Sequence, residues 1–424
     1  MRFTRWASAI AMIGTLALSA CGSGGGGNDG NTNVRLLNAS VGYSSLDLKV
    51  NDTKVSSGVN FGTVSNYGSI STGSNTSELL VAGTTTLLSA PGLSNLIKDG
   101  NYSLIAFGAS GSLSTRLLNE SEPEPASGST KLLTLNLSPD AGTVDVYVTA
   151  PGASLDDATP LAASLVPGNG DAYRTITSGT YRIRVTSATN KKDLRLDIPS
   201  VNLDSAKVNT LVLTSATGGV MVNGLLLAQQ GAVTKYENGL AKVRAMSALT
   251  RDDSATVSFN GTKALENRPA PARSSYFDIT VTNGLKVDWS VNGTAQAPQT
   301  VALERSGVYG ILLWGDAAAP TLTALKEDNS LPTGLNQAKV RVLNSVKGLG
   351  KVSLYIAAQP LIADVEPGQL SSSILLSTTS EIQFDVRAGA PTVFLSKKTL
   401  TANKVYTIWL TGTPGALEGT WIDP

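Results

Sequence analysis

The stretch Val34–Val50, VRLLNASVGYSSLDLKV, decides the fold because three further copies of it follow along the chain. The copies align without gaps and begin 98, 111 and 97 residues apart, at Leu132 (LLTLNLSPDAGTVDVYV), Val243 (VRAMSALTRDDSATVSF) and Val340 (VRVLNSVKGLGKVSLYI). Every copy reads as two short strands around a turn. The second strand alternates apolar and polar residues, which is the period of a strand with one buried face.

A second apolar block recurs 66 to 77 residues into each copy: YSLIAFG from Tyr102, NTLVLTS from Asn209, YGILLWG from Tyr309 and YTIWLTG from Tyr406. A period near 100 residues matches whole domains, since solenoid repeats run about 20–50 residues. Many short strands with frequent turns favour the immunoglobulin-like β-sandwich. We therefore predict an all-β chain of tandem immunoglobulin-like β-sandwich domains, in units 33–118, 130–228, 240–326 and 336–424.

The N-terminal residues predict export and anchoring. A basic head and an apolar run, residues 6–17, lead into Leu18-Ser19-Ala20-Cys21, the order of a secretory signal peptide. This ending resembles the lipobox of bacterial lipoproteins, whose cysteine takes a diacylglycerol and becomes the first mature residue. The resemblance implies a lipoprotein signal peptide at 1–20. Lipidated Cys21 then opens a Gly-rich, flexible tether over 21–32.

The alternative for this segment is a plain signal peptide whose cysteine is incidental. A transmembrane helix is disfavoured, because it needs about 20 apolar residues. Gly22 after the cysteine, rather than aspartate, favours the outer membrane in a cell with two membranes. We expect a cell-envelope protein that faces the periplasm or the surface, with the membrane as its partner through the lipid on Cys21.

Composition excludes several chemistries. The 424 residues contain no histidine and one cysteine, so histidine-dependent triads, histidine-ligated metals and mature thiol nucleophiles are excluded. The formal net charge is +1, and no basic stripe of the kind that binds nucleic acid occurs. We expect no catalytic residue, no cofactor, no metal site and no nucleic-acid partner.

At the two repeated blocks the chain resembles the bacterial family known as domain of unknown function 4397. Its units open with V-R-V-x-x-A-S, continue into V-D-V-Y-V and contain F-G-x-V-S-x-Y. In the first unit Val34, Arg35, Ala39, Ser40 and Asp47 fit the opening motifs, and residues 61–67 read F-G-T-V-S-N-Y. In the second unit residues 144–148 read V-D-V-Y-V. Units 3 and 4 have Thr256 and Ser353 in place of the aspartate and lack F-G-x-V-S-x-Y. The resemblance implies an exported, often lipid-anchored protein, and it implies no activity.

Acidic residues are the first candidates for a site. Asp47 and Asp145 lie in the polar register of alternating strands, which predicts solvent-facing side chains. The pairs 156–157 and 252–253 are both Asp-Asp. They lack the alternating spacing of a calcium loop, so we interpret them as solvated turns rather than calcium ligands or glycosidase carboxylates.

Tryptophans are the other candidates, because an exposed aromatic face can stack on a sugar. Trp289, Trp314 and Trp409 lie within apolar strand patterns, which predicts core packing. Trp421, three residues from the last residue of the sequence, is the one predicted to make a surface contact.

Two functions fit this sequence. The first is a lipid-anchored envelope protein that acts as a non-catalytic binding, adhesion or spacer module, with an envelope protein or a glycan as ligand. The second is a secreted carbohydrate-active or hydrolytic protein that uses Asp and Glu alone. The scarcity of tunable acid–base groups favours the first, and we predict that the protein is not an enzyme.

Overall fold

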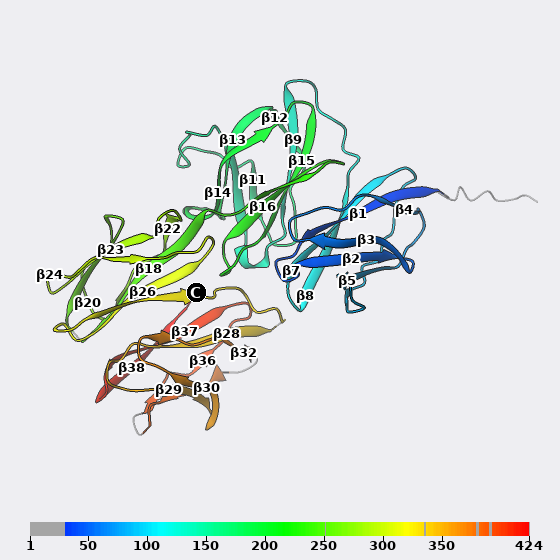
Figure 1. The fold of residues 1–424 in the computed structure, drawn as a ribbon. Coiled ribbons are helices and arrows are strands. Elements are labelled where there is room, and N and C mark those ends of the chain that lie inside the picture. Colours follow the sequence, from blue (N-terminus) through cyan, green and yellow to red (C-terminus); the bar gives the residue numbers. More distant parts are fainter. Residues whose placement is uncertain (1–29, 251, 335, 379–380, 390–391, 424) are drawn as a thin grey trace, which may run out of the picture.

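The computed structural model describes residues 30–250, 252–334, 336–378, 381–389 and 392–423. Within these residues the chain forms β-strands in paired sheets, which confirms the predicted class of tandem β-sandwiches. The one helical element described is a single 3-10 turn, η1 (Pro139–Ala141). Figure 1 shows the strands grouped into units that follow one another along the sequence.

Unit 1 comprises two four-stranded sheets, of order β4-β1-β7-β8 and β3-β2-β5-β6. Its strands are β1 (Asn31–Ala39), β2 (Ser45–Val50), β3 (Thr53–Asn60), β4 (Gly68–Ser71), β5 (Ser77–Val81), β6 (Leu87–Ser89), β7 (Asn101–Ala109) and β8 (Ser112–Asn119). The first strand pairs in parallel with β7, so the two repeated apolar blocks lie side by side. We call the sheet that holds the first strand of a unit its first-strand sheet.

Unit 2 repeats this topology, with sheets β12-β9-β15-β16-β17 and β11-β10-β13-β14. Its strands are β9 (Ser129–Asn136), β10 (Val144–Thr149), β11 (Ala162–Leu165), β12 (Arg174–Thr177), β13 (Gly179–Ser187), β14 (Asn190–Leu203), β15 (Lys207–Ser215), β16 (Val222–Ala228) and β17 (Val233–Tyr236). The fifth strand, β17, belongs to a stretch whose sequence lacks strand alternation.

Unit 3 has a first-strand sheet of order β21-β18-β26-β27, in which β22 also pairs with β18, and a second sheet of β20-β19-β23-β24, in which β25 pairs with β23. Its strands are β18 (Leu240–Leu249), β19 (Ser254–Phe259), β20 (Thr262–Pro269), β21 (Ala272–Arg273), β22 (Phe277–Thr280), β23 (Leu285–Val291), β24 (Thr294–Ala295), β25 (Gln299–Val301), β26 (Val308–Gly315) and β27 (Thr321–Glu327).

Unit 4 has the sheets β31-β28-β37-β38, with β32 also on β28, and β30-β29-β34-β35, beside a short β33-β36 ladder. Its strands are β28 (Gln337–Asn344), β29 (Val352–Ile356), β30 (Gln359–Val365), β31 (Gln369–Leu370), β32 (Ile374–Ser377), β33 (Glu381–Ile382), β34 (Phe384–Arg387), β35 (Thr392–Phe394), β36 (Lys398–Thr399), β37 (Val405–Thr413) and β38 (Ala416–Ile422).

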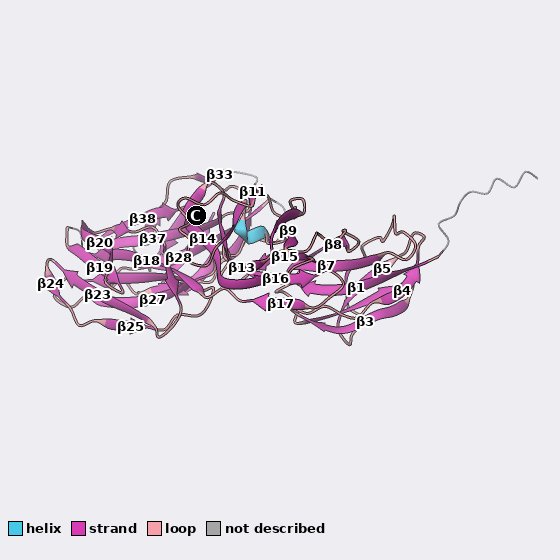
Figure 2. Cartoon of the chain, turned by 90° about the horizontal axis from the view of Figure 1, so that it is seen from above, coloured by secondary structure: helices cyan, strands magenta, loops and turns pink. Residues whose placement is uncertain are grey.

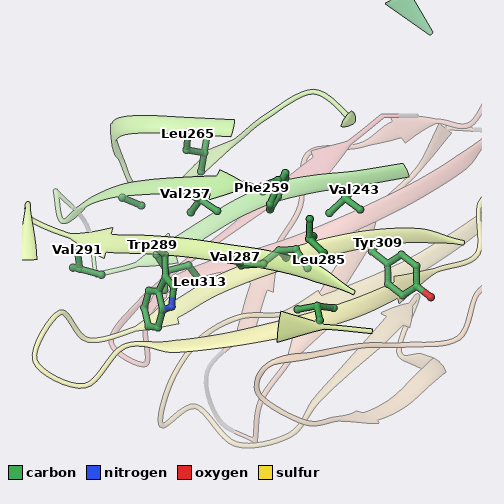
Figure 3. Packing of buried hydrophobic residues seen from close by; sticks show 14 of the residues in the cluster. Val243, Val257, Phe259, Leu265, Leu285, Val287, Trp289, Val291, Tyr309 and Leu313 are labelled. Atoms are coloured by element: carbon green, nitrogen blue, oxygen red, sulfur yellow. The ribbon is translucent and has the colours of Figure 1, made fainter. Parts of the chain in front are cut away.

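Each unit encloses a core of its own between its two sheets. In unit 3, Val257 and Phe259 from β19 pack with Trp289 from β23 and Leu313 from β26 (Figure 3). In β19, buried and half-buried residues alternate, as the period-two pattern predicts for a strand with one buried face.

The first strands do not alternate, and the structure shows why. All ten residues of β18 are buried, and so is every residue of β1 from Val34 to Ala39. One face of the first-strand sheet lies on the unit's own core, and the other lies against a neighbouring unit. Figures 1 and 2 show the resulting elongated array, with unit 1 at one end and units 3 and 4 side by side at the other.

Candidate functional site

The predicted lipobox residues, Leu18, Ser19, Ala20 and Cys21, lie outside the residues that the structure describes. Lipidation of Cys21 therefore stays a prediction. The described part of the chain contains no helix that is long and apolar enough to cross a membrane.

The prediction that Asp47 faces solvent is wrong. Asp47 is only 1% exposed, and its Oδ1 accepts the backbone N–H of Gly58 at 2.7 Å. Its Oδ2 accepts the N–H of Gly83 at 3.2 Å and the Nζ–H of Lys54 at 2.8 Å. Gly58 has φ +63° at a register shift between β2 and β3, so the carboxylate holds a β-bulge whose N–H the ladder leaves unpaired.

Asp145 is buried for the same reason, again against the prediction. Its Oδ1 accepts the N–H of Ser164 at 2.7 Å, and its Oδ2 accepts that of Thr189 at 2.9 Å. In unit 3 the Thr256 hydroxyl accepts the N–H of Asn267, and in unit 4 the Ser353 hydroxyl accepts that of Asp364. In all four units the side chain at this repeat position accepts a hydrogen bond from the bulge of the edge strand. The position therefore has a structural role.

We expect Asp47→Ala to lower the free energy of unfolding of unit 1 by about 1.5–3 kcal/mol, because two backbone donors and Lys54 lose a charged acceptor. Native-state hydrogen exchange of the amides in β3 measures the change. The matched control is Asp157→Ala, whose side chain is exposed on a turn of unit 2 and should leave exchange unaltered. Equal protection of β3 in both variants would contradict the structural role.

The two Asp-Asp pairs, 156–157 and 252–253, are the remaining acidic candidates. Among the described residues, no group of three or more Asp or Glu side chains is placed to hold a metal. Asp156 and Asp157 are exposed on a turn, and Asp253 accepts a hydrogen bond from Asn292. These placements agree with solvated turns.

Of the four tryptophans in the described part of the chain, two are buried and two are half-buried. Trp289 belongs to the core of unit 3, and Trp409 donates its Nε1–H to Ser345 Oγ at 2.9 Å. Trp314 and Trp409 both lie in a cluster between units 3 and 4 rather than within one core. Trp421, for which we predicted a surface contact, is half-buried, and its ring packs edge-on against Phe384 with the centroids 5.1 Å apart.

Two hollows open at equivalent edges of units 1 and 4. One, of about 420 Å³, lies between residues 55–59 and 63–67, and the other, of about 410 Å³, lies between residues 361–366 and 369–374. The unit 1 hollow has no carboxylate in its lining. The unit 4 hollow has two, Asp364 and Glu366, and Glu366 pairs with Lys351. The unit 1 hollow therefore lacks the pair of carboxylates that a glycosidase requires.

Charged side chains gather instead at the joint between units 3 and 4. Glu327, the last residue of β27, is 2% exposed and bridges two arginines. Its Oε1 and Oε2 accept Nε–H and Nη2–H of Arg244, at 2.9 and 2.8 Å, and Oε2 also accepts Nη2–H of Arg341 at 2.9 Å. Tyr276 donates its hydroxyl to the same Oε2 and lays its ring over the Arg244 guanidinium.

A matching network joins units 1 and 2. Arg35 donates Nε–H and Nη2–H to Glu120, at 3.0 and 2.7 Å, and its Nη1–H to the carbonyl of Gly231 in unit 2 at 2.6 Å. The Glu120 side chain also accepts the backbone N–H of Gln230. Tyr67 stacks on Arg35 at 4.7 Å, as Tyr276 does on Arg244. Burial, and then the Glu120 charge, raise the pKa of the Tyr67 phenol.

The sequence predictions did not include these Arg–Glu–Tyr networks, although the sequence contains one sign of them. An arginine follows the first valine in three of the four copies, and in each of the three it stands between two apolar residues. Tyr276 also shows that the S-x-Y end of the family motif persists in unit 3. Ser274 accepts the backbone N–H of Ala245, as Ser65 accepts that of Leu36.

Apolar faces complete the two joints. Between units 1 and 2, eleven buried residues share one cluster, among them Leu37, Ile105, Leu135 and Val212. Between units 3 and 4, seven buried residues share another, among them Met246, Leu312, Leu343 and Trp409.

The joint between units 2 and 3 is more polar. Its cluster has four buried residues: Ala216, Met221, Leu240 and Val308. Lys242 pairs with Asp193 of unit 2 at 2.9 Å and with Asp278 of its own unit at 2.8 Å.

Residues 32–147 match the model of the family described as "Domain of unknown function (DUF4397)", which confirms the resemblance there. The match covers unit 1 and ends within β10, the second strand of unit 2. No curated protein matches the chain. Among solved structures, a family 26 carbohydrate-binding module of Eubacterium rectale Amy13K, solved with maltoheptaose, is 13% identical, covering 44% of this chain and 98% of that one, with a TM-score of 0.15.

The Bacillus anthracis TIE protein is 9% identical, covering 91% of this chain and 69% of its own, also with a TM-score of 0.15. At these scores neither likeness carries an argument about ligands. The joints therefore remain the most developed candidate site in the described part of the chain.

Proposed function

We propose that the chain is a lipid-anchored, non-catalytic cell-envelope protein whose β-sandwiches form a stiff spacer that presents loops for binding or adhesion. The observation that carries the proposal is the burial of Glu120 and Glu327 between units. A flexible string of domains would leave its linkers in water, whereas here the linker carboxylates are locked to arginines and covered. Fixed joints keep a set distance between an anchor and a far end.

The loops at the ends of rigid sandwiches are the natural ligand-contacting surface of such a protein. The ligand class we propose is an envelope protein or a glycan. Anchoring through Cys21 places the protein at the outer membrane of a cell with two membranes, facing the periplasm or the surface.

Binding and catalysis are separated by one experiment on the mature protein. It is screened against glycan and envelope-protein arrays and assayed with peptidoglycan, polysaccharide and ester substrates. We expect binding without turnover. Turnover that is abolished by changing one Asp or Glu, with the fold intact, would replace the proposal with an Asp/Glu-dependent hydrolase.

Cys21→Ser is expected to move the protein from the membrane fraction to the soluble fraction, because stable anchoring needs two or more acyl chains. Fractionation followed by immunoblotting measures the shift, and intact mass of the extracted wild type should show an acylated Cys21. Ser19→Gly keeps a small residue before the cysteine and serves as the control that stays in the membrane. A Cys21→Ser protein that still sediments with membranes would contradict the anchor.

A further inference from the structure

We propose that the stiff array has one hinge. Units 1 and 2 form body 1, units 3 and 4 form body 2, and the two bodies pivot at the joint between units 2 and 3. A set of polar contacts, which we call the latch, holds that joint closed. This inference goes beyond the proposed spacer, because it keeps the fixed joints within each pair of units and assigns the one movable joint to the boundary between the pairs.

The first argument is that the two within-body joints are copies of each other. By the repeat alignment, Leu37, Ile105 and Phe107 of unit 1 correspond to Met246, Leu312 and Trp314 of unit 3. Leu135 and Val212 of unit 2 correspond to Leu343 and Trp409 of unit 4. These residues make up the shared clusters of the two joints. The Arg35–Glu120 pair corresponds to Arg244–Glu327 in the same way.

The second argument is spacing along the sequence. Copies begin 98 residues apart within body 1 and 97 within body 2, but 111 apart across the joint between the bodies. Duplication of one pair of sandwiches accounts for the nearly equal spacings within the two bodies and for their matching joints. The outer face of each first-strand sheet is an interaction surface whose partner is the neighbouring sandwich of the same body.

The third argument is the chemistry of the joint between the bodies. The latch comprises the ion pair of Lys242 with Asp193 and the hydrogen bond from the N–H of Leu331 to Asp140 Oδ1 at 2.6 Å. It also includes the hydrogen bond from the N–H of Asn329 to the carbonyl of Gly218 at 2.9 Å. Polar groups can exchange such partners for water, whereas the apolar faces within a body cannot be exposed at similar cost.

The pivot is the short connector between β17 and β18, residues 237–239. Asn238 anchors it by donating from Nδ2 to the carbonyls of Arg195 and Val222. Gly239 follows, and no atom lies within 4 Å of the position that a Cβ would take there. Opening the latch therefore swings body 2 about this connector while body 1 stays with the N-terminal anchor.

Pulsed electron–electron double resonance, which measures distances between spin labels, tests the hinge on the full mature chain. Cys21 is replaced by serine, and spin labels are placed at exposed positions in three pairs: Ser57–Thr159 within body 1, Thr294–Ser396 within body 2, and Thr159–Thr294 across the hinge. Asp140→Ala combined with Lys242→Met should widen the across-hinge distribution about twofold and leave both within-body distributions unchanged. Asp157→Ala is the control and should change none of them.

An across-hinge distribution that stays narrow in the latch variant would overturn the proposal, and so would equal widening of all three pairs. Native-state hydrogen exchange of the wild type gives a second test that needs no latch variant. In body 2, the free energies of opening of the amides in β26 and β37 should decrease with urea concentration along one common line. In body 1, those of the amides in β7 and β15 should follow a second common line. A different urea dependence for each of the four strands, or one dependence shared by all four, would contradict the division into two bodies.

Discussion

Glu327→Ala is expected to lower the free energy of unfolding of units 3 and 4 by about 3–5 kcal/mol, because removing one partner leaves buried charge uncompensated. Arg244 and Arg341 would both lose their carboxylate while their side chains stay 7% and 4% exposed. The Tyr276 hydroxyl would lose its acceptor as well.

Urea unfolding followed by tryptophan fluorescence measures this effect cleanly. After removal of the leader, every tryptophan lies between residues 289 and 421, so the signal reports units 3 and 4 alone. The matched control is Glu304→Ala, whose carboxylate is 70% exposed in a pair with Lys326 and should contribute under about 1 kcal/mol. Similar losses in the two variants would show that the joint network is not stabilising.

The pH dependence of the same variant has a defined sign. Burial opposes the charge of Glu327, but Arg244 and Arg341 hold the pKa of its carboxyl below the ordinary 4.5. A depressed folded pKa means that this stabilisation is complete above the unfolded pKa and is lost as pH falls through the folded one. The difference in the free energy of unfolding between wild type and Glu327→Ala should therefore be constant near neutral pH and should decrease only below pH 4.5.

The all-β fold could be predicted because its signal is local. Period-two alternation in the second strand of each copy and the gapless repeats are both visible in the sequence, and the core positions of β19 follow them. The full burial of β18 was visible too, as a run without alternation, but the run does not say what covers the second face. That partner lies about 100 residues away in the chain.

The candidate site could not be predicted, and Asp47 shows the reason. An aspartate in the polar register of a strand normally faces water, and this one is buried because a bulge with positive φ turns unpaired N–H groups toward it. Bulges leave no reliable mark in sequence. Glu120 and Glu327 lie in polar stretches that read as linkers, and only the stacking of two sandwiches converts them into buried partners of arginine.

Leu312→Ala is expected to lower the free energy of unfolding by about 2–5 kcal/mol, the usual cost of a cavity at a buried leucine. In β26, Ile311 and Leu313 enter the core of unit 3, whereas Leu312 points to the cluster shared with unit 4. The cavity therefore opens against unit 4. The control is Leu375→Ala, at a leucine that is 50% exposed, with an expected change within about 0.5 kcal/mol.

Two single-tryptophan versions of the chain decide whether units 3 and 4 unfold as one. Trp289 reports the core of unit 3 and Trp421 that of unit 4. Because the lost contacts join the two units, Leu312→Ala should lower the urea midpoints of both reporters equally. A shift confined to Trp289 would mean that unit 4 keeps its stability without its neighbour, and the two units would then be independent sandwiches rather than one body.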